Sequence, residues 1–125
     1  MRRTEQREHI LRVIFGTEFY PPEELDEQID LYFEQTGIDD EKDRAYIGEK
    51  AKKIAAKVPE LDKLINEHTT GCKTVRMNKA DLSILRLAVY EMKMDEDVPV
   101  SVAINEAVEL AKRYGGEDSP SFVNG

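Results

Sequence analysis

The chain has 125 residues, of which 40% are hydrophobic and 35% charged, a composition that suits one folded domain and excludes a low-complexity or disordered protein. Its formal net charge of −8 argues against a uniformly basic nucleic-acid-binding surface, because phosphate contacts require Lys and Arg. The single cysteine, Cys72, excludes an intramolecular disulfide, and no apolar run is long enough to cross a bilayer, so we expect a cytoplasmic protein without membrane contact.

Charge is distributed unevenly along the chain. Residues 1–17 hold four arginines against two glutamates, whereas residues 18–43 hold eleven acidic residues against one lysine. Residues 44–125 balance thirteen acidic with thirteen basic residues. The amino end therefore stays available to an anion in an otherwise acidic protein.

Apolar residues in the first half recur at helical spacing in three segments. The first helix is predicted over about Arg3 to Gly16, the second begins after Pro21-Pro22 and ends at Thr36-Gly37, and the third covers about Asp40 to Lys57. The outer face of the third helix is predicted to be solvated by its lysines, which are Lys50, Lys52, Lys53 and Lys57.

Further helices are predicted after Pro59. A short one ends near Thr69-Thr70-Gly71. Asn78 is the expected N-cap of the next helix, with Asp81 as the reciprocal capping residue. That helix is apolar over most of its circumference, so it should be the central one.

The last third of the chain predicts one more complete helix and the beginning of another. The complete helix ends at Gly115-Gly116, and Ser119-Pro120 opens the next. One face of the complete helix is predicted to carry its apolar residues Ile104, Ala107, Val108 and Ala111. No alternating run predicts a strand, so the fold class is all-α.

Signatures of catalysis and of metal binding are lacking in the sequence. His9, His68 and Cys72 are the soft ligands, and their spacing matches no recognised metal site. There is no glycine-rich phosphate loop after a strand. We therefore expect no enzyme activity, no catalytic residue, no cofactor and no metal.

Arginines at the amino end are the best candidates for contact with RNA. Guanidinium groups bind phosphate in a bidentate manner and stack on exposed bases. Arg3 and Arg7 are one helical turn apart, and the alternative is that they are ordinary solvated residues. The candidate RNA-binding residues are Arg2, Arg3, Arg7 and Arg12, with Lys73 and Arg76 as a second basic cluster.

Four short segments carry a resemblance to a known family. They are Ile84-Leu85-Arg86-Leu87-Ala88-Val89-Tyr90-Glu91-Met92, Val98-Pro99, Ala103-Ile104-Asn105-Glu106-Ala107-Val108-Glu109-Leu110-Ala111-Lys112 and Phe122-Val123-Asn124-Gly125. This part of the chain resembles the NusB family of bacterial transcription antitermination factors. The resemblance implies a single NusB-like domain over residues 1–125, a compact helical bundle of two packed halves with three to four helices each, at about 1–58 and 59–125. Family members usually continue further, so the final helix is expected to be truncated at Gly125.

The resemblance also implies partners. Family members bind boxA-type RNA together with the small-subunit ribosomal protein that acts as NusE, within the RNA polymerase antitermination complex that transcribes ribosomal RNA operons. By this analogy Phe122 stacks on a base, or else packs in the core. Asp81 and Asp118 are the candidate partner-binding residues, although a capping role would equally explain Asp81. An exposed groove left by the short final helix makes a homodimer possible.

Two other functions remain open at this point. NusB-like domains also occur fused to RNA cytosine methyltransferases, where they assist an enzyme, but this chain has no room for a methyltransferase domain. A helical adaptor with little RNA affinity of its own is favoured by the net charge of −8 and by Thr4, Glu5 and Gln6, which stand where family members often have basic residues.

Overall fold

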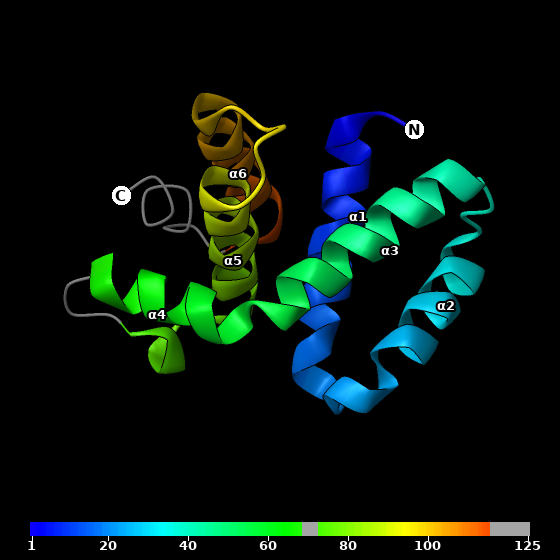
Figure 1. Ribbon diagram of the computed structural model, residues 1–125, viewed down its shortest axis with the longest axis horizontal. Coiled ribbons are helices and arrows are strands. Elements are labelled where there is room, and N and C mark those ends of the chain that lie inside the picture. The colour runs from blue at the N-terminus through cyan, green and yellow to red at the C-terminus, as the bar shows by residue number, and fades with distance from the viewer. Residues whose placement is uncertain (69–72, 116–125) are drawn as a thin grey trace. The chain divides into compact units, whose positions relative to one another are not determined.

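The structure is a computed structural model that describes residues 1–68 and 73–115, apart from the side chains of His68 and Arg76. These residues form six α-helices, three short 3₁₀ turns and no strand, which confirms the predicted all-α fold class (Figure 1). The chain divides into two compact units, Met1–Ala56 and Lys57–Gly125. The boundary predicted from the sequence lies between residues 58 and 59.

The first unit contains three helices. α1 (Arg3–Gly16) packs along α3 (Glu41–Ala56), and α2 (Leu25–Thr36) lies against α3 (Figure 1). The 3₁₀ turns η1 (Thr17–Phe19) and η2 (Pro22–Glu24) connect α1 to α2. The buried apolar residues of this unit are Ile10, Leu11, Val13, Ile14, Ile29, Phe33, Ile38, Ile47, Ala51 and Ile54. Removing these side chains from water is the main favourable contribution to folding.

Two glycines allow α2 and α3 to turn and to approach each other. Gly37 ends α2 with a φ of 74°, in the left-handed region that glycine adopts without strain, and its N–H donates to the carbonyl oxygen of Phe33 at 3.0 Å. A Cβ atom built on Gly48 of α3 would lie 3.7 Å from the Ile29 Cγ2 atom of α2. The predicted carboxyl end of α2 is therefore confirmed, whereas its predicted start after Pro21-Pro22 is the 3₁₀ turn η2, and α2 itself begins at Leu25.

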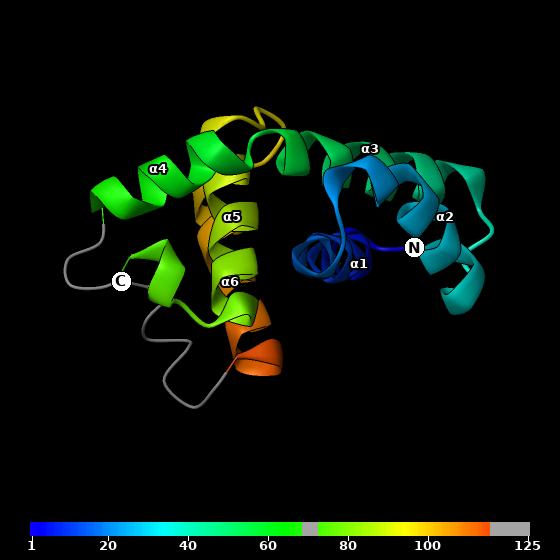
Figure 2. The same ribbon diagram turned by 90° about the horizontal axis from the view of Figure 1, so that it is seen from below.

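The second unit is arranged around a central helix. α5 (Lys79–Lys93) packs against both α4 (Val58–His68) and α6 (Val100–Tyr114), as its broad apolar surface predicts (Figures 1 and 2). The turn η3 (Thr74–Arg76) leads into α5. Asn78 caps α5, because its Oδ1 atom accepts a hydrogen bond from the N–H of Ala80 at 2.7 Å. The N-cap prediction is confirmed.

Apolar packing and one ion pair join α4 to α5. Ile65 of α4 clusters with Met77 and Leu82. Beside this cluster, the Nε and Nη2 atoms of Arg86 donate to the two carboxylate oxygens of Asp62, each at 2.8 Å. A bidentate pair of this kind fixes the rotation of the two helices as well as their separation.

One predicted helix face is wrong in detail. The buried residues of α6 are Ala103, Ala107, Leu110 and Ala111, which recur at helical spacing. Ile104, predicted to lie on the packed face, is exposed, because it is one position away from the stripe that packs inward. Gly115 ends α6 as predicted, and the helix expected from Ser119-Pro120 lies outside the described residues.

Candidate nucleic-acid interface

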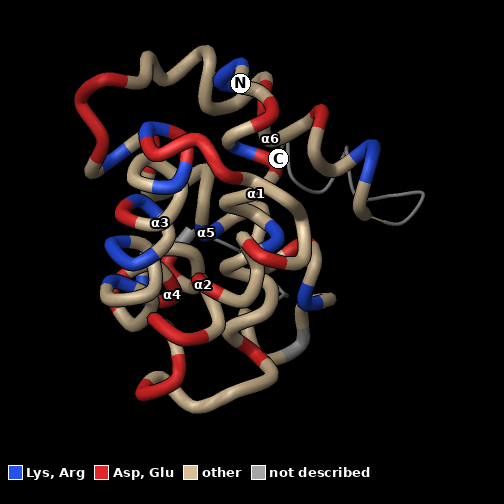
Figure 3. Tube along the Cα trace, turned by 90° about the vertical axis from the view of Figure 1, so that its right-hand side faces the viewer, with Lys and Arg blue, Asp and Glu red and all other residues tan. Residues whose placement is uncertain are grey.

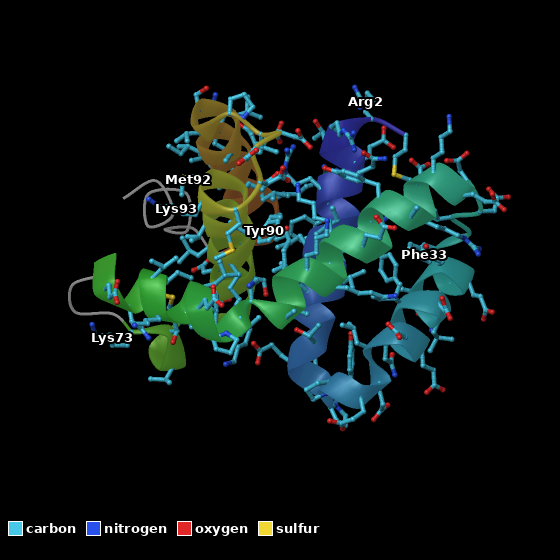
Figure 4. The ribbon with its side chains drawn as sticks, viewed as in Figure 1. Arg2, Phe33, Lys73, Tyr90, Met92 and Lys93 are labelled. Carbon is cyan, nitrogen blue, oxygen red and sulfur yellow. The ribbon has the colours of Figure 1, made fainter. Side chains whose placement is uncertain are left out.

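The amino end of α1 presents two arginines at the surface. Arg2 is 84% exposed and its Nε atom lies 3.2 Å from Glu5 Oε1, an ion pair in solvent that contributes little to stability (Figure 4). Arg3 is exposed too, but its guanidinium is held in place, because its carbon Cζ lies 3.9 Å from the centroid of the Tyr46 ring. This cation–π contact aligns a planar cation on a helix end without neutralising its charge.

A chain of hydrogen bonds ties this end of α1 to the beginning of α3. Arg3 Nη1 donates to Gln6 Oε1 at 2.9 Å, and Gln6 Nε2 donates to Asp43 Oδ1 at 2.9 Å. The terminal amino group of Met1 lies 3.8 Å from the other Asp43 oxygen. Gln6 and Asp43 are buried, so the network is rigid and orders the segment that carries the arginines.

The first turn of α1 also offers backbone donors. Arg2 is the N-cap residue, and its side chain makes no capping hydrogen bond to the N–H groups that follow it. The first helical N–H to find a backbone acceptor at this end is that of Gln6, which donates to the carbonyl oxygen of Arg2 at 3.0 Å. Uncapped N–H groups and the positive end of the helix dipole attract anions such as phosphate.

Arg7 requires a correction. Its predicted role was to bind RNA beside Arg3, but the side chain is 6% exposed and lies in the interior of the structure. The burial contradicts the exposed position expected for Arg7, whose guanidinium is engaged within the protein in this conformation. Sequence spacing places Arg3 and Arg7 one turn apart on α1, but it could not show that the protein leaves Arg3 exposed and covers Arg7.

Lys50 requires a second correction. It was predicted to be solvated on the outer face of α3, yet it is buried, and its Nζ atom donates to the Tyr46 hydroxyl at 3.2 Å. The same Nζ lies 5.5 Å from the centroid of the Tyr46 ring. Lys52 and Lys53 are exposed as predicted, and Lys52 pairs with Asp26 at 3.0 Å. Tyr46 therefore has one cation from α1 and one from α3 close to its ring.

The remaining candidate of the first unit lies further along α1. Arg12 is exposed, and its Nη2 atom is 3.7 Å from Glu8 Oε1. It follows Arg3 by nine residues, or about 13 Å along the helix axis. The structure thus places Arg2 and Arg3 together, with Arg12 separate from them on the same helix.

The second unit contains the other candidates. Lys73 is exposed, and its Nζ atom donates to the carbonyl oxygen of Asn66 at 2.9 Å (Figure 4). The backbone of Arg76 belongs to η3, but its side chain is outside the described part. Asp118 and Phe122 also lie outside the described residues.

Asp81 does not cap α5 in the way predicted. It lies in the first turn of α5, where the helix dipole favours a carboxylate. Its Oδ1 atom is buried and has no hydrogen-bond partner among the described residues, so this oxygen takes no part in a reciprocal cap. A reciprocal cap through this oxygen therefore does not account for the acidic residue at position 81.

Sequence reasoning missed the residues that organise the amino end, namely Gln6, Asp43 and Tyr46. A signal for one of them was present, because Asp43 belongs to an acidic run at a helix start opposite an arginine-rich segment. Nothing in the local pattern of Gln6 or Tyr46 shows that they contact each other's helices. Their partners are about 40 residues away along the chain, and only the packing of α1 on α3 brings them together.

Two titratable side chains elsewhere in the first unit have shifted pKa values. Burial, with a contribution from Arg12, lowers the pKa of His9 below its ordinary value. His9 Nδ1 lies 2.6 Å from the Tyr32 hydroxyl, a hydrogen bond between α1 and α2. Burial raises the pKa of Tyr20.

Among the described residues, no three His, Cys, Asp or Glu side chains are grouped so that they could hold a metal ion. In the same part of the chain, none of the helices combines the length and the apolar character that a membrane span requires. The fold and the site thus define an all-helical protein whose most distinctive polar feature is an arginine-bearing helix end.

Residues 4–125 match the sequence profile of the NusB family. The transcription antitermination protein NusB of Agathobacter rectalis is 48% identical over the whole chain, which spans 95% of that relative. NusB of Lachnoclostridium phytofermentans is 46% identical, with the same coverage. The crystal structure of T. maritima NusB superposes with a TM-score of 0.87 at 31% identity, covering 99% of this chain and 86% of that one.

A protein chain from the crystal structure of a plectonemic RNA supercoil has the same fold, with a TM-score of 0.84 at 24% identity, covering 99% of this chain and 90% of that one. The chain described here belongs to the NusB family of transcription antitermination proteins. The resemblance noted from its last third therefore extends over almost its full length.

Proposed function

We propose that this protein promotes read-through in ribosomal RNA operons by binding boxA-type RNA together with the ribosomal protein that acts as NusE, within a cytoplasmic RNA polymerase antitermination complex. It acts by binding and not by catalysis. The observation that carries the RNA-binding part is the position of Arg3, exposed at an uncapped helix end and held over Tyr46.

The location of these arginines has a cost to the fold. A cation in the first turn of a helix faces the positive end of the helix dipole, which costs about 0.3–1 kcal/mol. Glu5 is the one acidic residue in that turn. Stability alone would favour acidic residues there, so the arginines are better explained by an anionic ligand whose phosphates also meet the free N–H groups.

The segregated charge of the chain supports the same proposal. The amino end is basic, while the α2 region and its flanking turns are acidic (Figure 3). Acidic residues in the α2 region repel phosphate there and so favour RNA binding at the basic amino end. Binding through few phosphates is weak by itself, which agrees with a need for a second, basic protein on the same RNA.

Other residues complete the proposal. Arg12, Lys73, Arg76 and Phe122 extend the RNA contact, and Asp81 and Asp118 contact the ribosomal protein. Asp81 has the clearest support, because its buried Oδ1 atom lacks a hydrogen-bond donor in the described residues. Arg7 is left out of the RNA contact because of its burial.

Titration of labelled boxA RNA across a salt series tests the proposal, with the protein alone and with its ribosomal partner. Arg3→Ala should weaken binding about five- to ten-fold and reduce the salt slope by about 0.7, the value for one phosphate contact with a single strand. Lys53→Ala removes the same charge from an exposed site on α3 and serves as the control. Equal effects of the two substitutions would reject the assignment of Arg3.

Tyr46 provides a second arm of this experiment. Tyr46→Leu keeps the charge of Arg3 but removes the ring that positions it, so affinity should fall while the salt slope stays constant. Arg3→Lys should also lose affinity, because an ammonium group cannot replace a stacked, planar guanidinium. If Tyr46→Leu left affinity unchanged, the ring would have no part in RNA binding.

A helical adaptor with little RNA affinity is the second candidate. The burial of Arg7 favours it, because the exposed arginines of the first unit are then fewer than the sequence suggests. Under that function, the protein would bind its ribosomal partner with normal affinity, and boxA RNA would add nothing to the complex at any salt concentration.

A further inference from the structure

A pocket lies between the carboxyl end of α1 and the exposed side of α2, within the first unit. Its volume is about 140 Å³, and it is lined by Val13, Tyr20, Gln28, Leu31, Tyr32 and Gln35. This is smaller than the roughly 300–1,000 Å³ of a typical small-molecule site, so it suits one side chain of a larger partner. Val13 follows Arg3 by ten residues, or about 15 Å along α1, so the pocket is separate from Arg2 and Arg3 at the amino end of that helix.

The walls of the pocket combine aromatic rings with hydrogen-bond acceptors. Tyr32 is held in place by the 2.6 Å contact of its hydroxyl with His9 Nδ1. Gln28 and Gln35 are two turns apart on α2, and each lines the pocket with a neutral amide whose oxygen can accept hydrogen bonds. Aromatic faces beside neutral acceptors are suited to a guanidinium group, which stacks on rings and donates in its own plane.

The edge of the pocket is apolar and exposed. Phe19 is 71% exposed, directly before Tyr20, and Leu31 is 41% exposed on α2. The Phe19 ring is supported by Phe15, with 5.3 Å between the ring centroids. An exposed aromatic beside a pocket is a common anchor of a protein–protein interface.

The surrounding charge identifies the kind of partner. Residues 17–36 contain seven acidic residues and no Lys or Arg (Figure 3). Helical spacing places Glu24 next to Gln28, and both Glu27 and Glu34 next to Leu31. Two cations of the unit, Arg12 and Lys52, are paired with Glu8 and Asp26, so their charges are partly neutralised. Phosphate would be repelled here and a cationic segment attracted.

We infer that the pocket formed by α1, η1 and α2 is a docking site for an arginine-bearing basic segment of a partner protein. The arginine inserts between Tyr20 and Tyr32 toward the amide oxygens of α2. Apolar residues beside it cover Phe19 and Leu31, and further cations pair with the acidic rim. This inference does not depend on RNA binding at the amino end of α1.

The test is an NMR titration of the ¹⁵N-labelled protein with a blocked peptide of Lys and Ala residues that carries one central arginine. Backbone signals of the pocket residues should shift progressively. The same peptide with citrulline, a neutral isostere of arginine, should bind about ten-fold more weakly.

Two variants with the same change in charge locate the contact. Gln28→Lys places a cation in the pocket and should weaken the arginine peptide about ten-fold or more. Asp30→Asn changes the net charge by the same +1, by removing a carboxylate on the opposite side of α2, and should have little effect. Gln35→Lys, at a more exposed position, is a second pocket variant that preserves folding, which circular dichroism verifies.

Four results would overturn the docking proposal. The inference would be overturned if the peptide shifted signals in all acidic segments, or if Gln28→Lys and Asp30→Asn weakened peptide binding equally. Either result would mean that the peptide binds by non-specific charge attraction and not in the pocket. No shift at millimolar peptide would overturn it as well. A single-stranded RNA that shifted the pocket signals in place of the peptide would identify the wrong class of partner.

Discussion

Removing the carboxylate that pairs with Arg86 should destabilise the protein more than any exposed ion pair does. Arg86 is 8% exposed and Asp62 24%, and two hydrogen bonds of 2.8 Å join them. Truncation of one partner in a fully buried pair costs about 3–5 kcal/mol, because a desolvated charge loses its counter-ion. Since Asp62 retains some contact with water, we expect about 2–3 kcal/mol for Asp62→Ala.

Urea unfolding followed by circular dichroism at the helical band measures this loss, since the chain has no tryptophan for fluorescence. With an m value of about 2 kcal/mol/M, the midpoint should fall by about 1–1.5 M urea. Glu109→Ala is the control, because Glu109 and Lys112 form a 3.2 Å pair that is more than half exposed on both sides. That substitution should change stability by less than about 0.5 kcal/mol.

A double variant separates the charge from the packing. Replacing the pair by Asp62→Leu and Arg86→Met should cost less than Asp62→Ala alone, because no desolvated charge remains in the interior. If Asp62→Ala shifted the midpoint no more than Glu109→Ala does, the reasoning from burial and bidentate geometry would be refuted.

Two further predictions concern the first unit. Gly37→Ala should destabilise the protein by about 1 kcal/mol, because the φ of 74° at this position is strained for alanine. Gly48→Ala should stabilise it by up to about 1 kcal/mol, because the position is helical and the added Cβ would lie 3.7 Å from the nearest side-chain atom. Thermal melts should therefore show a lower melting temperature for Gly37→Ala and a higher one for Gly48→Ala, and changes in the same direction would contradict the prediction. His9 has a lowered pKa in the folded state, so the unfolded chain binds the proton more readily, and stability should be full above about pH 6.5 and decline as the pH falls below it. The difference in unfolding free energy between pH 7.5 and 5.5 should be smaller in His9→Gln, and an unchanged difference would assign the pH dependence to other groups.

The boundaries of the helices were largely predictable from the sequence. Asn78 caps α5, Gly37 ends α2, and Gly115 follows α6, as their residue types indicate. Caps and left-handed turns depend on the conformation of a few neighbouring residues, so the chain encodes them locally. The same applies to the central position of α5, because a helix that is apolar over most of its surface needs neighbours on several sides.

The candidate site was predictable only in part. Arginines at the amino end were identified by type and position, and Arg2 and Arg3 are exposed. Arg7 and Lys50 were assigned to the surface and are buried. Charged side chains are normally exposed, so only specific interior contacts could reverse that expectation, and those contacts come from helices distant in sequence.

What the sequence determined by itself is the all-helical architecture, the segregation of charge and the membership of the NusB family, because periodicity, caps and composition act over short distances. Only the tertiary structure decided which cations face solvent and which ring holds Arg3, because Tyr46 reaches that guanidinium through the packing of α3 on α1. Side-chain contacts between separate helices depend on the angle and register at which the helices pack, and no local pattern specifies either.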